Sequence, residues 1–216
     1  AEMTKDKKEL LEINTLKKLK FNLEKNIPAR KIELDEDELE VIKSFNLITL
    51  KPIIYVSNVS EEDILNGGND YYKEVCDYAK KENSEVVMIC AKIESELAEL
   101  NDDDKKEFLS ELGIEESGLD QLIKKTYSLL GLATFFTAGS DEVKAWTFKK
   151  GMKAPECAGI IHTDFERGFI RAEVMSYDDL IKYGSEKDVK DNGKMRLEGK
   201  EYLMQDGDIC YFRFNV

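Results

Sequence analysis

The first 45 residues carry apolar side chains at spacings of three and four, which is the period of an amphipathic helix. One such pattern runs over residues 3–26 and ends before Pro28; a second, "EDELEVIKSF", follows Asp35, whose side chain can cap a helix. The residues that share one face are Leu16, Leu19 and Leu23 in the first pattern and Leu39, Ile42 and Phe45 in the second. Together the two patterns predict an antiparallel helical hairpin.

Two uninterrupted β-branched runs come next, "IIYVS" at 53–57 and "EVVMIC" at 85–90. The segment between them, "NDYYKEVCDYAKKEN", has helical periodicity, so residues 53–90 are interpreted as a βαβ unit. Because the two runs do not alternate with polar residues, we expect a parallel sheet that is covered on both faces. Three further helices are predicted in "AKIESELAEL", "DDDKKEFLSEL" and "SGLDQLIKKTYSLLG".

The pattern changes at about residue 132, where short strand-like runs alternate with turn residues. We expect strands in "LATFFTAG" and "EVKAWTF" around a turn at Gly139, a helix in "APECAGII", a strand in "FIRAEVMSY", a helix in "YDDLIKYG", and a final pair of strands in "GKEYLMQDGDICYFRFNV". The expected core residues of this compact module are Phe135, Trp146, Phe169, Tyr211 and Phe214. The fold class is therefore α/β followed by α+β.

The 216 residues are enough for one large domain or two small ones, and their net charge of −13 is unevenly distributed. Residues 132–216 carry 13 Lys and Arg against 15 Asp and Glu, so the other 19 of 32 basic and 30 of 45 acidic residues precede them. This acidic first part argues against non-specific binding to nucleic acid, which depends on neutralising phosphates with Lys and Arg, and no specific binding to DNA is expected.

The amino-acid composition also limits which metal-binding and catalytic sites are expected. The four cysteines, Cys76, Cys90, Cys157 and Cys210, show no Cys-x-x-Cys spacing, and the sequence has one His. We therefore expect no metal site and no catalytic triad, and we interpret the cysteines as reduced thiols of a cytoplasmic protein. No apolar run approaches the roughly 20 residues that span a bilayer, so no membrane contact is expected.

Candidate chemistry lies where the two predicted parallel strands end. The residues at these ends are Asn58, Val59, Ser60 and Glu61 after the first strand, and Cys90, Ala91 and Lys92 after the second. The carboxyl ends of parallel strands are where α/β proteins bind ligands. Nucleotide-binding GTPases carry Asn-Lys-x-Asp and Ser-Ala-Lys in two such loops, and the Asp accepts the two N–H donors of guanine. Here Val59 and Glu61 replace the Lys and the Asp.

These replacements should weaken the preference for guanine. Asn58 can pair with N7 and N6 of adenine, a bidentate contact natural to Asn, while backbone groups near Val59 and Cys90 would supply the remainder. A motif of the form Asn-x-x-Glu is by itself equally typical of a strand that ends in an Asx turn before a helix-start carboxylate. The second loop, "CAK" at 90–92, is what favours the base site.

Several segments together resemble the YchF or Obg-like ATPase family. They are "KPIIYVSNVSE", "CAKIESELAEL", "FFTAGSDEVKAWTF", "APECAGIIHTDFERGFIRAEV" and "EYLMQDGDICYFRFNV". The resemblance runs from about Leu50 to Val216, and the stretch from Ala158 to Val174 is far more specific than the Asn-x-x-Glu motif. In that family Asn-x-x-Glu replaces the GTPase motif and accompanies a preference for ATP.

The resemblance implies three domains. Residues 1–45 would be the returning part of a helical hairpin, 46–131 the C-terminal portion of a G domain with a partial parallel sheet, and 132–216 a TGS domain with a β-grasp fold. It also implies a cytoplasmic ATPase that uses ATP or GTP with magnesium and contacts the ribosome, tRNA or other RNA through the TGS domain. The implied base contacts are Asn58, Val59, Glu61, Cys90, Ala91 and Lys92.

One departure from the family pattern concerns the phosphates. The family has a P-loop, GxxxxGK[ST], and this sequence has no such motif, since Gly193-Lys194 and Gly199-Lys200 are followed by Met and Glu. We therefore expect a C-terminal fragment, cut within the hairpin, that does not hydrolyse ATP, holds no nucleotide tightly and contains no catalytic or metal-binding residue. Self-association could cover the edge of the interrupted sheet. The alternative is a stand-alone binding module that contains a TGS domain and has no nucleotide chemistry.

A partner surface is conceivable in the last module. Its basic residues are Lys149, Lys150, Lys153, Arg167 and Arg171, with Phe165 and Phe169 as candidates for base stacking. A solvated surface over core phenylalanines explains the same residues equally well. For His162 we expect a structural or partner-contact role rather than a catalytic one.

Overall fold

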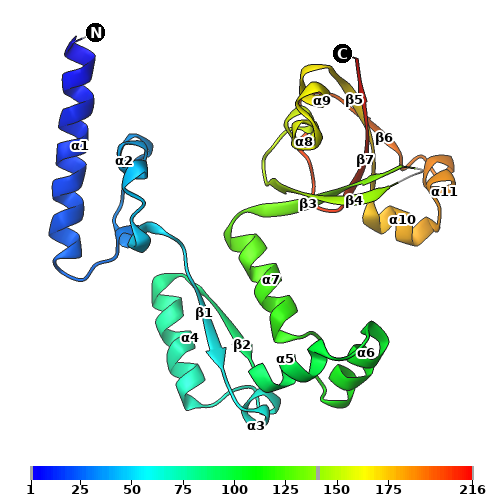
Figure 1. The fold of residues 1–216 in the computed structure, drawn as a ribbon, viewed down its shortest axis with the longest axis horizontal. Helices are drawn as coiled ribbons and strands as arrows, with labels where there is room; N and C mark the ends of the chain where they lie inside the picture. Colours follow the sequence, from blue (N-terminus) through cyan, green and yellow to red (C-terminus); the bar gives the residue numbers. More distant parts are fainter. Residues whose placement is uncertain (1, 140–141, 216) are drawn as a thin grey trace. The chain divides into compact units, whose positions relative to one another are not determined.

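In a computed structural model, residues 2–139 and 142–215 are described, and the chain divides into two compact units, residues 1–123 and 124–216 (Figure 1). The division falls inside the helix α7 (Gly118–Leu129). Each unit has its own apolar clusters and its own sheet. Both units combine helices with strands, which is the α/β character that the sequence predicts.

The first unit opens with the long helix α1 (Glu2–Leu23) and the shorter α2 (Glu36–Ile42), which pack on each other. A capping box starts α2, because Asp35 accepts from the Glu38 backbone N–H while the Glu38 side chain accepts from that of Asp35. The 3-10 turns η1 (Ala29–Lys31), η2 (Lys43–Phe45) and η3 (Ile48–Leu50) connect this region to the sheet. The buried residues of this cluster are Leu19, Ala29 and Ile42.

The predicted stripe of the second helix is only partly correct. Ile42 is fully buried, but Leu39 and Phe45 are 40% and 46% exposed. The physical reason is that the α-helix ends at Ile42 and continues as η2, whose tighter winding moves Phe45 off the buried face. Asn46 then ends the turn in the left-handed conformation, with a φ of 47°.

The βαβ unit is confirmed. Strands β1 (Ile54–Asn58) and β2 (Glu85–Ile89) pair in parallel, from Ile54 opposite Glu85 to Asn58 opposite Ile89. Helix α4 (Asp70–Glu82) connects them, packs on both, and is capped by Asn69. Among the described residues this sheet has two strands, and Val56 is 44% exposed. Within the described residues, the face of β1 that carries Val56 is therefore partly exposed, so the expected cover on both faces is incomplete.

The remaining helices of this unit are α3 (Glu61–Leu65), α5 (Ala91–Ala98), α6 (Asp102–Glu111) and the start of α7. The last three helices are predicted from the sequence, whereas the short helix α3 is not. Cys90, Ile93 and Leu97 form the buried centre of their cluster.

The second unit contains a five-stranded mixed sheet. Its strands are β3 (Leu132–Ala138), β4 (Val143–Lys149), β5 (Phe169–Ser176), β6 (Arg196–Glu198) and β7 (Asp208–Phe214). The spatial order is β4-β3-β7-β5-β6, in which β3 and β7 run parallel and the other pairs antiparallel. Two residues of the predicted turn after Gly139, Ser140 and Asp141, lie outside the described residues.

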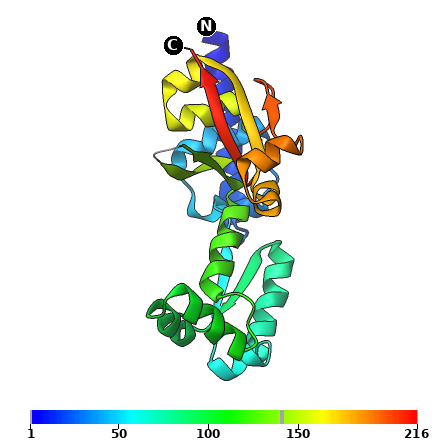
Figure 2. The same cartoon turned by 90° about the vertical axis from the view of Figure 1, so that its right-hand side faces the viewer.

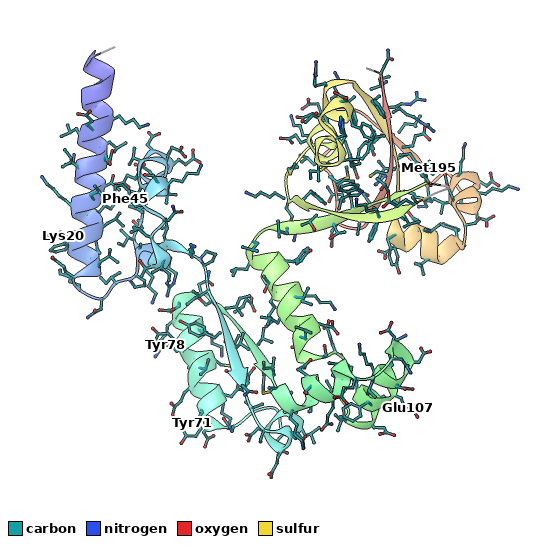
Figure 3. The ribbon with its side chains drawn as sticks, in the orientation of Figure 1. Lys20, Phe45, Tyr71, Tyr78, Glu107 and Met195 are labelled. Atoms are coloured by element: carbon teal, nitrogen blue, oxygen red, sulfur yellow. The ribbon has the colours of Figure 1, made fainter. Side chains whose placement is uncertain are left out.

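Helices lie against both faces of this sheet (Figure 2). The pair α8 (Ala154–Ile161) and α9 (Thr163–Arg167) covers the face that holds Phe135, Phe148 and Phe169. The pair α10 (Tyr177–Tyr183) and α11 (Glu186–Asp191) covers part of the other face, which holds Met175 and Ile209 and against which Met195 packs (Figure 3). Because consecutive strand residues point to opposite faces, one sheet serves two apolar clusters.

Three expectations for this unit need correction. The predicted final pair of strands is a single strand, β7, because Leu203 makes only an isolated bridge with Lys153, and β7 pairs with β5 and β3 instead. The helices α9 and α11 and the strand β6 were not predicted. Phe214 is 39% exposed and is not a core residue, since it lies at the end of β7 and stacks on Phe165.

Candidate functional site

The two parallel strands end side by side, and the predicted base-site residues lie at these ends. A hollow of about 460 Å³ is lined by Asn58, Val59, Ser60, Glu61, Glu62, Cys90, Ala91 and Lys92. All six residues that the sequence singles out are among them. They come together because β1 and β2 run parallel in register, so that the loop after each strand opens at the same edge of the sheet.

Asn58 connects the two loops. Its side-chain oxygen, Oδ1, accepts a hydrogen bond from the backbone N–H of Ala91 at 3.1 Å. The backbone N–H of Val59 donates to the carbonyl oxygen of Ile89 at 2.8 Å, which gives the two loops a second hydrogen bond. Among the described residues, no group accepts a hydrogen bond from the Asn58 side-chain nitrogen, Nδ2. The exposed Asn58 therefore presents an N–H donor at the hollow.

Glu61 and Lys92 form an ion pair across the two loops, with 2.9 Å between Lys92 Nζ and Glu61 Oε1. Their side chains are 43% and 69% exposed, respectively. The hydrogen bond with Glu61 raises the pKa of Lys92 above its ordinary value, so the ammonium is charged at neutral pH. The sequence placed both residues at the site without indicating that they pair, since 31 positions separate them and no short-range rule relates them.

Ser60 and Glu62 also line the hollow and were not singled out from the sequence. Ser60 caps α3 by accepting from the Asp63 backbone N–H, and its hydroxyl donates to the Asp63 carboxylate. Asn69, the cap of α4, donates to the same carboxylate, and together these hydrogen bonds lower the pKa of Asp63. The Ser-x-x-Asp spacing is a sequence signal that could have predicted this short helix.

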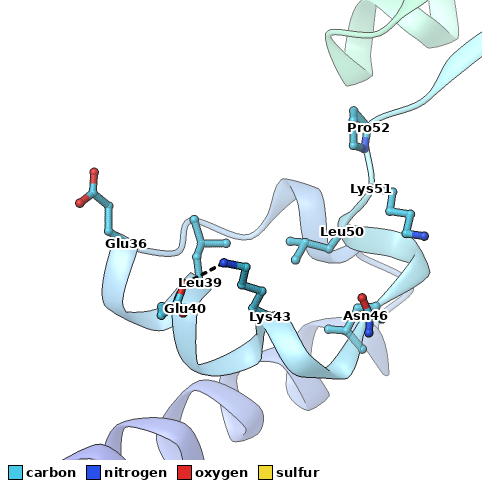
Figure 4. Close-up of a pocket in the computed structure, with 9 residues that line it drawn as sticks. Glu36, Leu39, Glu40, Lys43, Asn46, Leu50, Lys51 and Pro52 are labelled. Atoms are coloured by element: carbon cyan, nitrogen blue, oxygen red, sulfur yellow. Dashed lines mark hydrogen bonds and ion pairs between the residues drawn. The ribbon is translucent and has the colours of Figure 1, made fainter. Parts of the chain in front are cut away.

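A second hollow in the first unit has a different character (Figure 4). It measures about 530 Å³ and lies beside α2, η2 and η3, where its apolar lining comes from Leu39, Leu47, Leu50 and Pro52. Its charged residues include Glu40 and Lys43, which pair with each other at 3.4 Å. No residue of the predicted base site lies in it, and its lining indicates a packing surface rather than a site for chemistry.

Three of the five basic residues of the possible partner surface on the second unit lie within 4.0 Å of a carboxylate, and one of them is Arg167, at 3.8 Å from Asp164. Lys153 pairs with Glu201 at 2.6 Å, and Arg171 lies 4.0 Å from Glu173, which Arg213 also contacts. Phe169 is 3% exposed, so it cannot stack on a base; of the two alternatives from the sequence, the structure supports the core position, against α8 and α9.

His162 has a structural role. It caps α9 by accepting a hydrogen bond from the Asp164 backbone N–H at Nδ1, at 3.2 Å. Its ring lies 6.3 Å from that of Phe165. These contacts are compatible with the structural or partner-contact role that the sequence predicts for His162.

The cysteines are free thiols, and burial raises the pKa of Cys157 to about 12. Over residues 2–139 and 142–215, no cluster of three or more His, Cys, Asp or Glu side chains is placed to hold a metal ion. None of the described helices is both long enough and apolar enough to cross a membrane.

Comparison with known proteins gives consistent matches. Residues 132–215 match the family model YchF-GTPase_C, described as a protein of unknown function (DUF933). The "Ribosome-binding ATPase YchF" of Bacillus subtilis is 59% identical over 213 residues, and its counterpart in Escherichia coli O157:H7 is 46% identical over 211; each match covers 98% of this chain. The chain spans 58% of the length of both relatives.

Structural comparison agrees. The YchF GTPase of Schizosaccharomyces pombe superposes with a TM-score of 0.80 at 35% sequence identity, over 93% of this chain and 53% of that one. A GTP-binding protein from Pyrococcus horikoshii shares the fold, with a TM-score of 0.54 at 15% identity.

Proposed function

The chain belongs to the YchF family, and from this we propose that its first unit carries the base-recognition part of a purine nucleotide site. The observation that carries the proposal is the hollow at the ends of β1 and β2, where Asn58, Glu61 and Lys92 lie together. We propose ATP as the nucleotide of the whole protein, with GTP as the weaker ligand, and the cytoplasm as its location. The site residues are Asn58, Val59, Glu61, Cys90, Ala91 and Lys92.

Asn58 is the proposed anchor of the base. Its Nδ2 group can donate to N7, an acceptor that every natural purine nucleotide offers. Its Oδ1 atom already accepts from Ala91, but a carbonyl oxygen has two lone pairs and can accept once more, from the N6 amine of adenine. The bond to Ala91 fixes the orientation of the amide before a ligand arrives, so binding loses little side-chain entropy.

The phosphates and magnesium belong to the proposal for the whole protein. The described residues supply no cluster of carboxylates for a magnesium ion, and the sequence has no P-loop motif. The residues of this chain therefore bind and orient the base in the proposal, and no step of phosphate transfer is assigned to them.

For the second unit we propose a TGS domain with a β-grasp fold that contacts the ribosome or another RNA. Supporting observations are the mixed sheet crossed by α8 and the word "ribosome-binding" in the names of the relatives. Lys149 and Lys150 are exposed and are candidates for phosphate contacts, whereas the exposed Arg167 lies 3.8 Å from the Asp164 carboxylate.

Asn58→Asp tests the base site sharply. The new carboxylate keeps an acceptor for the Ala91 N–H but removes the N–H donor, so affinity for AMP should fall about tenfold, because the hydrogen bond to N7 is lost and the carboxylate faces the N7 lone pair. The measurement is a titration of the 216-residue chain with AMP, followed by NMR at the amides of residues 58–61 and 90–92.

Asn66→Asp is the matched control, because Asn66 is exposed at the end of α3 and does not line the hollow. Unchanged AMP binding by Asn58→Asp would overturn the role of Asn58. If the wild-type chain shows no saturable shift with AMP, the base site is wrong and the reading as a binding module without nucleotide chemistry replaces it.

A further inference from the structure

The ion pair between Glu61 and Lys92 changes what the base site offers to a ligand. Glu61 is the first residue of α3 and Lys92 the second residue of α5, and their 2.9 Å contact joins the two loops at the mouth of the hollow. Glu62 also lines the hollow and forms no ion pair with any described residue. Of the two adjacent glutamates, Glu61 is therefore the one that pairs with Lys92.

A carboxylate that is paired with an ammonium is a poor receptor for guanine. Guanine presents two N–H donors, at N1 and N2, and these would compete with Lys92 for the lone pairs of the Glu61 carboxylate. An ammonium group has three N–H donors and no acceptor. One donor of Lys92 is used on Glu61, so the others remain for a ligand at the hollow.

Adenine and guanine differ at N1, the ring position to which Lys92 could donate a hydrogen bond. Adenine N1 carries a lone pair, whereas guanine N1 carries a hydrogen. N1 lies on the other side of the exocyclic N6 from N7, so a base that contacts Asn58 through N7 and N6 presents N1 beside that contact. The residues that line the rest of the hollow include Glu61 and Lys92.

We propose that Lys92 is a specificity-determining residue, whose ammonium group donates to N1 of adenine and disfavours the N1–H of guanine, and that Glu61 is a positioning residue that holds Lys92 in place. This inference rests on the proposed base site and adds to it the group that distinguishes the two purines. The acidic groups that act on Lys92 are Glu61 and, more weakly, Glu96 on the same helix as Lys92.

The alternative is that Glu61 and Lys92 form a solvated surface ion pair, which contributes little to stability or to ligand binding. Nucleotide analogues in which one ring nitrogen is replaced distinguish a specificity contact by Lys92 from a surface ion pair. In 1-deaza-AMP a C–H group replaces N1, and in 7-deaza-AMP a C–H group replaces N7, while the rest of each molecule matches AMP. The 216-residue chain is titrated with AMP and both analogues, and binding is followed by NMR. The N1 ratio is the affinity for AMP divided by that for 1-deaza-AMP, and the N7 ratio is the affinity for AMP divided by that for 7-deaza-AMP.

The expected result is a wild-type chain that binds AMP about three- to tenfold more tightly than 1-deaza-AMP, the range for an exposed hydrogen bond to a charged group. In Lys92→Met the N1 ratio should fall to about one while the N7 ratio, which depends on Asn58, stays as in wild type. Glu61→Gln should lower the N1 ratio partly and leave the N7 ratio unchanged. Lys73→Met, which breaks an exposed pair with Asp70 outside the hollow, should change neither ratio.

The outcomes are distinguishable. An N1 ratio of one in the wild-type chain, with a normal N7 ratio, overturns this inference and leaves the base site intact. A wild-type N1 ratio that persists in Lys92→Met assigns N1 to another group and also overturns it. If no saturable binding of any of the three nucleotides occurs, the proposed base site fails and the inference fails with it.

Discussion

The parallel pair β1–β2 and the five-stranded sheet of residues 124–216 bury their side chains to very different extents. In β5, Phe169, Ala172, Val174 and Met175 are buried, and three positions of β7 are buried as well. In β1 no residue is buried, and in β2 only Val87 is. Yet the runs "IIYVS" and "EVVMIC" are more apolar in sequence than "FIRAEVMSY".

The comparison shows that burial depends on neighbours rather than on the strand itself. Each face of β5 meets a pair of helices, and β7 and β6 pair with its two edges. Among the described residues, β1 pairs with β2 alone, and α4 packs against them. A two-stranded sheet is marginal without such cover, so we expect the two sheets to differ in stability.

Amide hydrogen exchange should reveal the largest effect. Because local opening ranges from nearly free to the full unfolding free energy, amides of β5 and β7 should be protected on the order of a hundredfold more than those of β1 and β2. The measurement is exchange followed residue by residue by NMR at neutral pH. Sedimentation should first establish a monomer, since association could cover β1 and raise its protection. Equal protection of the two sheets in a verified monomer would contradict the comparison.

Local patterns allowed prediction of much of both units, for reasons visible in particular residues. Asp35 and Glu38 form the capping box that their spacing suggests, and the helical period between Asn69 and Asn83 predicted α4. The predictions that were wrong concern contacts between residues that are distant in sequence. The segment before Gln205 resembles a strand but has only an isolated bridge, because the edge of β5 is taken by Arg196 to Glu198.

The next prediction concerns a charged cluster that stabilises the less buried unit. Glu82, at the end of α4, has a side chain only 3% exposed and accepts from Tyr55 Oη at 2.6 Å and from Tyr78 Oη at 3.1 Å. Lys31 and Arg30 of η1 contact the same carboxylate at 3.0 and 3.2 Å. The cluster therefore joins the α1–α2 region to the sheet.

These contacts, the hydrogen bond from Tyr55 first, lower the pKa of Glu82 from 4.5 to about 2. Because the folded pKa lies below the unfolded one, the stabilisation is fully present above about pH 4.5 and is lost as the pH falls towards 2. Glu82→Gln should remove this pH dependence from the unfolding of residues 1–123, measured by NMR between pH 5 and 2.5. Glu40→Gln, which alters an exposed pair with Lys43, is the control and should retain it. An identical pH profile for wild type and Glu82→Gln would show that the cluster does not couple to folding.

The candidate site divides in the same way between what local sequence can and cannot predict. Asn58 and the loop from Cys90 to Lys92 were predictable because each follows an apolar run directly. The Glu61–Lys92 pair and the Glu82 cluster were not, because they join residues from different elements. Hydrophobic periodicity indicates which face of an element is buried, but it carries no information about which charges meet.

The smallest expected effect lies at the end of β7 and sharpens the comparison within the well-buried unit. Phe214 is 39% exposed but stacks on Phe165, with ring centroids 3.9 Å apart and an angle of 26° between the planes. An aromatic pair contributes about 0.5–1.5 kcal/mol beyond its burial, so Phe214→Ala should destabilise the unit by about 1–2 kcal/mol. Phe135→Ala, at a fully buried position in contact with Phe148 and Phe212, should cost about 3–5 kcal/mol. Urea unfolding followed by the fluorescence of Trp146, the one tryptophan in the sequence, measures both. Equal costs for the two variants would mean that Phe214 is a core residue after all, because a partly exposed ring cannot leave a cavity as large as that left by Phe135.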